Sequence, residues 1–123
     1  MKNQIAYRLL ALALSPLLII ALGCHSYHIE TTVENRTGTA VRLLEVDYPS
    51  ASFGAQALAS GADFHYRFQV QGTGPIKVQY SYDAGQSPVI EGPTLTERQQ
   101  GRLEIVLLPG GKAEFTPQLT STP

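Results

Sequence analysis

The side chain with the most reactive chemistry in this 123-residue sequence is a single cysteine, Cys24. A lone thiol cannot form a disulfide within the chain, and it cannot supply the several thiolates of a structural zinc site. A cysteine can instead be an enzyme nucleophile or carry a covalent modification. Its position directly after a long apolar stretch favours modification.

The first 23 residues have the composition of a secretory signal. The start is basic, with Lys2 and Arg8 and no acid, and residues 9–22 form a run of 14 uncharged, mostly apolar residues. As a helix this run would rise about 21 Å, short of the roughly 30 Å hydrocarbon core of a bilayer. Pro16 in its middle is a further argument against a stable membrane-spanning helix. We therefore predict an N-terminal signal helix over residues 1–23.

The residues around the cysteine make this interpretation more specific. Ala21-Leu22-Gly23-Cys24 resembles the lipobox of bacterial lipoprotein precursors, in which a small residue precedes a cysteine that receives lipid. The family usually has Leu three residues before the cysteine, where this chain has Ala21. The resemblance implies that the Cys24 thiol receives a diacylglyceryl group, that signal peptidase II cleaves after Gly23, and that the new amino group is often acylated. Two or three acyl chains suffice to hold a protein on a membrane.

The residue after the cysteine bears on which membrane would carry the protein. In lipoproteins of diderm bacteria, Asp at that position favours retention at the inner membrane, and this chain has His25 there. The resemblance therefore implies a cell-envelope protein, anchored by lipid at Cys24 to the outer membrane and facing the periplasm. Two alternatives stay open: an uncleaved N-terminal anchor, and an ordinary secretory signal in which the cysteine is accidental.

The other chemistry-bearing residues form no recognisable site. His25 and His28 are three residues apart, a spacing that points side chains to opposite faces of an extended segment, and His65 falls on the polar face of its strand. No Gly-x-Ser-x-Gly nucleophile motif occurs, and the glycine-rich segment 72–75 leads into a strand rather than a helix. We predict no catalytic residue, no metal and no cofactor, and hence a protein that is not an enzyme. An enzyme of another class, a hydrolase of the cell envelope, stays open as an alternative.

The chain after Cys24 alternates apolar and polar residues with a period of two, which indicates β-strands. The clearest strands are residues 63–70 and 76–82, and the turn residues between them predict a hairpin. In the segment 39–48 the apolar phase changes between Leu43 and Leu44, which predicts a β-bulge or a strand buried on both faces. Further strands are expected over residues 27–34, 102–108 and 113–119, the last of them at a sheet edge.

Six to eight short strands in about 100 residues favour a single small antiparallel β-sandwich, immunoglobulin-like, with about seven strands. The chain then divides into a signal peptide, residues 1–23, and one all-β mature domain, residues 24–123. Seven basic and ten acidic residues give this domain a charge of about −3, without the clustered Lys and Arg that nucleic acid requires. Its aromatic core residues are expected to be Phe64, Tyr66, Phe68, Tyr80 and Phe115.

One segment is a candidate binding loop. Residues 47–54 place Tyr48 and Phe53 around Pro, Ser and Gly residues, and Tyr82 ends a strand beside a turn. Rings on loops of a rigid sandwich commonly contact partners, although the same rings can fold back over the core. The sequence predicts a lipid-anchored, non-enzymatic structural or protein-interaction module with an unknown envelope protein or glycan partner. The alternative is a small carbohydrate- or peptide-binding sandwich that uses the 47–54 loop.

Overall fold

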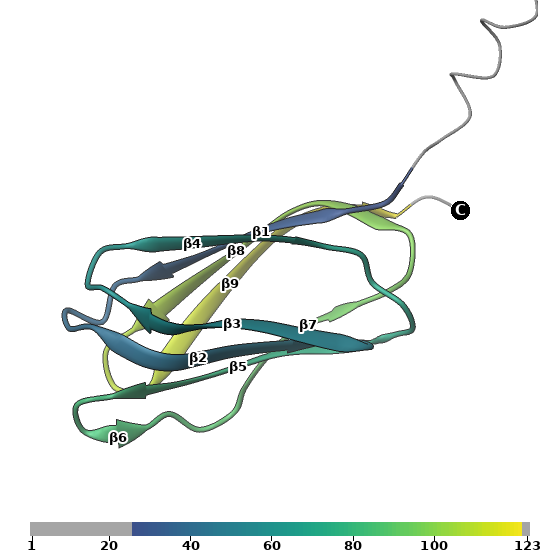
Figure 1. Cartoon of the computed structure of the whole chain (residues 1–123). Helices are drawn as coiled ribbons and strands as arrows, with labels where there is room; N and C mark the ends of the chain where they lie inside the picture. The colour runs from purple at the N-terminus through teal and green to yellow at the C-terminus, as the bar shows by residue number, and fades with distance from the viewer. Residues whose placement is uncertain (1–25, 122–123) are drawn as a thin grey trace, which may run out of the picture.

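The computed structural model describes residues 26–121, which form two β-sheets packed face to face (Figure 1). The described strands are β1 (Ile29–Asn35), β2 (Val41–Tyr48), β3 (Ala51–Leu58), β4 (Asp63–Phe68), β5 (Gly74–Tyr82), β6 (Gly85–Gln86), β7 (Ile90–Leu95), β8 (Gln99–Leu108) and β9 (Lys112–Ser121). One sheet has the order β4-β1-β8-β9, and the other has the order β3-β2-β5-β6 with β7 also paired to β5. The predicted all-β, two-sheet architecture is confirmed. The predicted signal helix and Cys24 lie outside the described residues.

The predicted strand count and strand direction need correction. The described segment contains nine strands rather than about seven, because β6 is a separate strand of two residues and β3 follows β2 after a tight turn. The sheets are antiparallel except for β1 and β8, which pair in parallel from Ile29 opposite Gly101 to Asn35 opposite Leu107. A parallel pair between strands so far apart in sequence leaves no trace in local periodicity.

The hairpin predicted between residues 63–70 and 76–82 is wrong. β4 pairs with β1, whereas β5 pairs with β2, so the chain passes from one sheet to the other between them. Val70 in this connection is buried between the sheets. Alternation determines which residues of a strand face inward, but it does not determine which strand is the neighbour.

The bulge predicted at Leu43 and Leu44 is confirmed. The register of β2 against β5 shifts between Arg42 and Glu45, and Leu43 has a φ of 49°. The extra residue lets Val41 and Leu44 both reach the core, although their spacing is odd. Leu43 itself is 60% exposed.

The core between the sheets is mainly aliphatic. Of the five aromatic residues expected there, Phe68 and Tyr80 are buried, Phe64 and Phe115 are half-buried, and Tyr66 is exposed. The aliphatic residues with almost no exposure are Ile29, Val33, Val41, Val46, Ile76, Val78, Leu95, Leu103, Ile105 and Leu107. These side chains come from both sheets, so packing across the interface holds the two sheets together.

Two buried polar side chains fix the connections. The Tyr80 hydroxyl lies 2.9 Å from the carbonyl oxygen of Leu108 and 2.8 Å from that of Lys112, to which it can donate its proton. Burial is the main cause of a raised pKa of Tyr80, and the electrostatic effect of the neighbouring Tyr82 raises this pKa further. The side-chain nitrogen of Asn35 lies within hydrogen-bond distance of three carbonyls, those of Thr39 and Ala59 in loops and that of Leu58 at the end of β3. Replacing either side chain would remove hydrogen bonds to these buried or partly buried carbonyls.

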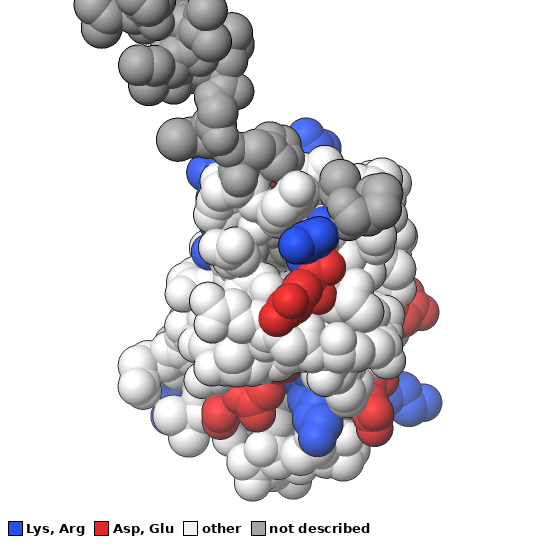
Figure 2. Space-filling view, turned by 90° about the vertical axis from the view of Figure 1, so that its right-hand side faces the viewer, with Lys and Arg blue, Asp and Glu red and all other residues white. Residues whose placement is uncertain are grey.

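The two ends of the sandwich carry different connections (Figure 1). At the N-terminal end, where β1 begins and β9 finishes, lie the β2–β3 turn, the segment 69–73 and the β7–β8 turn. At the far end lie the loops 36–40, 59–62 and 109–111. Charged side chains of both signs are scattered over the N-terminal end and form no large patch of one sign (Figure 2).

Candidate functional site

The structure does not bring the predicted site residues together. Cys24 and the cleavage position after Gly23 lie outside the described residues. The predicted 47–54 loop is instead a hairpin, in which Tyr48 pairs with Ala51 across a two-residue turn. Because β2 and β5 are antiparallel, Tyr48 and Tyr82 lie at opposite ends of the sandwich.

The rings of the predicted loop pack against the core. Phe53 is 7% exposed and stacks on Tyr66, with 4.3 Å between ring centroids, and Tyr48 stacks on Phe68 at 4.1 Å. Burial, together with the neighbouring hydroxyl of Tyr66, raises the pKa of Tyr48. Five rings thus fill the gap between the edge strands β3 and β4. We call them the aromatic edge: Tyr48, Phe53, Phe64, Tyr66 and Phe68.

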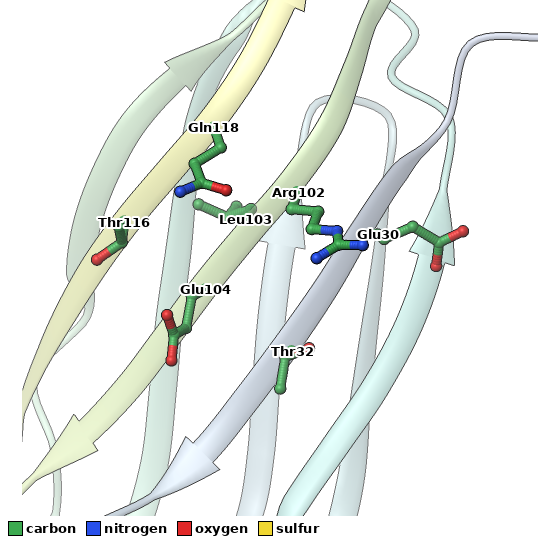
Figure 3. A pocket seen from close by; sticks show the side chains of 7 residues that line it. All are labelled: Glu30, Thr32, Arg102, Leu103, Glu104, Thr116 and Gln118. Carbon is green, nitrogen blue, oxygen red and sulfur yellow. The ribbon is translucent and has the colours of Figure 1, made fainter.

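A polar hollow lies on the outer face of the β4-β1-β8-β9 sheet (Figure 3). Its volume is about 310 Å³. Strands β1, β8 and β9 supply its lining residues: Glu30, Thr32, Arg102, Leu103, Glu104, Thr116 and Gln118. Apart from Leu103, which is buried, all of these are polar residues on the outward positions of their strands.

The strand register explains why these side chains meet. Two rows of outward residues cross the four strands. The first row is Arg67, Glu30, Arg102 and Gln118. The second row is His65, Thr32, Glu104 and Thr116. Directly opposite residues in a sheet have their Cβ atoms about 4.5–5.5 Å apart, so each row is a line of neighbouring functional groups.

The polar groups of this face differ in whether they have partners. Arg67 Nε lies 3.3 Å from the Glu30 carboxylate, and its Nη2 donates to His28 Nδ1 at 3.1 Å. The side chain of Arg102 forms no ion pair or hydrogen bond with any residue of the described segment. Figure 3 shows its guanidinium lying over β1, while the carboxylate of Glu30 points away from it. As far as the described residues are concerned, the guanidinium in the hollow is therefore available to a ligand.

The arrangement suits a small polar group. A guanidinium presents five N–H donors in a fixed geometry that matches a carboxylate or phosphate. The lining of the same hollow also includes the carboxylate of Glu104, the amide of Gln118 and the hydroxyl of Thr116, which offer further donors and acceptors. A second hollow of about 480 Å³ shares Glu30, Arg102 and Gln118 and continues toward the N-terminal end. The two hollows together form an elongated polar surface.

Other types of site are not apparent in the part of the chain that the structure describes. Residues 26–121 contain no group of three or more His, Cys, Asp or Glu side chains placed to hold a metal ion. The same residues include no helix with the length and apolarity needed to cross a membrane. Comparison of the chain with models of protein families, with curated proteins and with solved structures gave no match.

The polar hollow was missed by the sequence prediction. Its residues do fall on outward positions of predicted strands, which is the signal that the sequence contains. However, Glu30 and Arg102 become neighbours only through the parallel pairing of β1 with β8. Periodicity along one strand cannot reveal a row of residues that crosses four strands.

Proposed function

We propose that this chain is a lipid-anchored protein of the bacterial cell envelope whose β-sandwich acts as a non-enzymatic structural or protein-interaction module. The observation that carries the proposal is the polar hollow, whose lining combines carboxylate, amide and hydroxyl groups with a guanidinium that has no partner among residues 26–121. Such a surface recognises a polar partner through directed, charge-assisted hydrogen bonds. We also propose that the sandwich is of the immunoglobulin-like type. The two face-to-face sheets of short strands support this part of the proposal.

Lipidation at Cys24 places the domain close to the membrane. Only residues 25–28 separate this cysteine from the start of β1 at Ile29. Four extended residues span at most about 14 Å. The N-terminal end of the sandwich would then lie at the outer-membrane surface on the periplasmic side, and the polar hollow would stand beside it.

Substitution of Cys24 tests the anchor. In a diderm bacterial host, full-length Cys24→Ala should stay uncleaved and should fail to incorporate labelled fatty acid, because the acceptor thiol is missing. The matched control, Ser26→Ala, should be processed, labelled and recovered with membranes like the unchanged chain. A Cys24→Ala protein that is trimmed after Gly23 would contradict lipidation.

Site-specific crosslinking tests the interaction surface. A photo-crosslinking residue at Thr116, on the rim of the hollow, should give a defined adduct with an envelope component in cells. Arg102→Ala in the same chain should reduce this adduct at least about tenfold, as expected for loss of a charge-assisted contact. The same probe at Gln79 on the other sheet is the control and should give no such adduct. Equal adducts at both positions, or an adduct insensitive to Arg102→Ala, would refute the role of the hollow.

The second candidate function is binding of a small carbohydrate or peptide beside the 47–54 hairpin. A hollow of about 230 Å³ there is lined by Asp47, Tyr48, Pro49, Lys77 and neighbouring residues of β5. Addition of a chitooligosaccharide should then shift the NMR signals of these residues, and Tyr48→Ser should abolish the shift. Phe53 is left unchanged because it is part of the core. Unchanged spectra on addition of the sugar would argue against glycan recognition at this hairpin.

A further inference from the structure

The strand edges of the sandwich are unequally protected against pairing with another strand. Natural sheets guard their edges with charged side chains, prolines and interruptions. β4 carries the exposed charges of Asp63 and Arg67, and β9 contains Pro117. The edge beside β5 is divided between β6 and β7, and β7 contains Pro93. Each of these three edges has a recognisable guard.

β3 has no such guard. Its eight residues, from Ala51 to Leu58, include neither a charged residue nor a proline, and they keep one register against β2, in which every position except Leu43 opposite Gln56 is paired. β2 is its only strand partner in the described chain, so the backbone groups on its other side lack a strand neighbour. Uncharged, proline-free strands of this length readily accept another strand.

Exposed hydrophobic side chains flank this edge on both faces. The described residues include three large exposed hydrophobic side chains, and two of them are Leu43 and Tyr66. Leu43 lines a shallow hollow of about 430 Å³ together with Ser52, Gly54 and Gln56 of β3. Tyr66 stacks on the inward side of the same strand. Covering these side chains would add a hydrophobic contribution to strand pairing.

We propose that two copies of this chain associate by antiparallel pairing of β3 with β3, centred on Gly54. In this register Gly54 faces its counterpart, and Ser52 of one copy faces Gln56 of the other. The β3-containing sheets of the two copies then form one continuous sheet, and β3 brings no like charges together. A second copy is the occupant that fits, because β3 has no charge to select an oppositely charged partner and because both copies bring the same hydrophobic flanks.

The facing residues allow a test by charge exchange. The full-length chain in detergent should sediment as a dimer, and Ser52→Lys with Gln56→Lys should raise the dimer dissociation constant at least about tenfold, because lysines then face lysines. Ser52→Glu with Gln56→Glu should do the same. An equimolar mixture of these two variants should restore a dimer containing one copy of each. The matched control, Gln86→Lys with Thr94→Lys on β6 and β7, should dimerise like the unchanged chain.

Each result decides the proposal. Restored pairing in the mixture supports it, and also shows that the separate variants are folded. A chain that stays monomeric up to about 1 mM overturns it. Lysine variants that still dimerise, a mixture that stays monomeric while circular dichroism shows folded strands, or a control that dissociates equally would overturn it as well. None of these outcomes depends on Cys24, since every variant carries the same N-terminal sequence.

Discussion

The sandwich closes its two open edges in different ways. Between β3 and β4, the five stacked rings of the aromatic edge fill a wide gap. Between β7 and β9, the strands approach closely because Gly92 has no side chain: a Cβ there would lie 2.6 Å from the Phe115 ring and 2.8 Å from Ile76. We call the β3–β4 side the wide edge and the β7–β9 side the narrow edge. Replacing a large side chain by a small one should destabilise the wide edge, whereas adding a side chain at Gly92 should destabilise the narrow edge.

The largest effect is expected from removing a buried ring at the wide edge. Phe68 is 3% exposed and stacks on Tyr48, so Phe68→Ala should lower the free energy of unfolding by about 3–5 kcal/mol. Phe115→Ala at the narrow edge should cost clearly less, because Phe115 is only half-buried. Denaturant unfolding of both variants measures the difference, and equal losses would abolish the distinction between the edges.

Adding a methyl group should damage the narrow edge. Gly92→Ala forces the new Cβ against Phe115 and should cost about 1–3 kcal/mol, the usual range for overpacking. Phe115→Leu in the same chain should recover part of this loss. The matched control is Gly74→Ala, whose Cβ would meet only Pro49 at 3.5 Å. Equal melting temperatures for the two alanine variants would show that Gly92 does not set the spacing.

The outer ring of the wide edge should matter less than the inner rings. Tyr66 is 38% exposed, and Tyr66→Ala should cost roughly 0.5–1.5 kcal/mol through its stacking on Phe53. Phe53→Ser should cost more, because it puts a hydroxyl into the core in place of a buried ring. Thermal unfolding measures both variants. A lower melting temperature for Tyr66→Ala than for Phe53→Ser would contradict the assignment of Phe53 as an inner ring and Tyr66 as the outer ring.

The smallest effect concerns two acids on β2, next to the wide edge. A hydrogen bond with Asp47, and then its charge, raise the pKa of Glu45 above the usual 4.5. Protonation of Glu45 therefore favours the folded state, a contribution that is present at low pH and lost as pH rises through the raised pKa. Asp47→Asn should return the Glu45 pKa toward 4.5, as followed by NMR titration of its carboxyl group. An unchanged titration would exclude Asp47 as the cause.

Local features of the fold were predictable from the sequence. Alternation identified the inward face of β5, where Ile76, Val78 and Tyr80 are buried. The phase change at Leu43 identified the bulge, and Pro117 identified β9 as an edge strand. Each of these features depends on a residue and its immediate neighbours in sequence, which is the range over which a periodic pattern contains information.

Features that depend on strand pairing were not predictable. The rows of the polar hollow join Glu30 to Arg102 across the parallel pair, and no local pattern encodes this contact. For the candidate loop, the sequence left open whether the rings of Tyr48 and Phe53 contact a partner or fold back over the core. The two-residue turn makes Phe53 part of an inward-facing strand beside β4, so its ring folds back over the core. In both cases a long-range pairing determined the environment of the side chain.

The interior position of β1 in its sheet also determines how the domain would respond to a mechanical load. β1 is an interior strand, bonded to β4 on one side and to β8 on the other. Tension applied to its N-terminal end and resisted at the far end acts along the strand, so both sets of hydrogen bonds are strained in shear and must rupture together. An edge strand pulled sideways would instead detach one bond at a time. Tension on the chain before Ile29 would therefore load two strand pairs at once, β1 with β4 and β1 with β8.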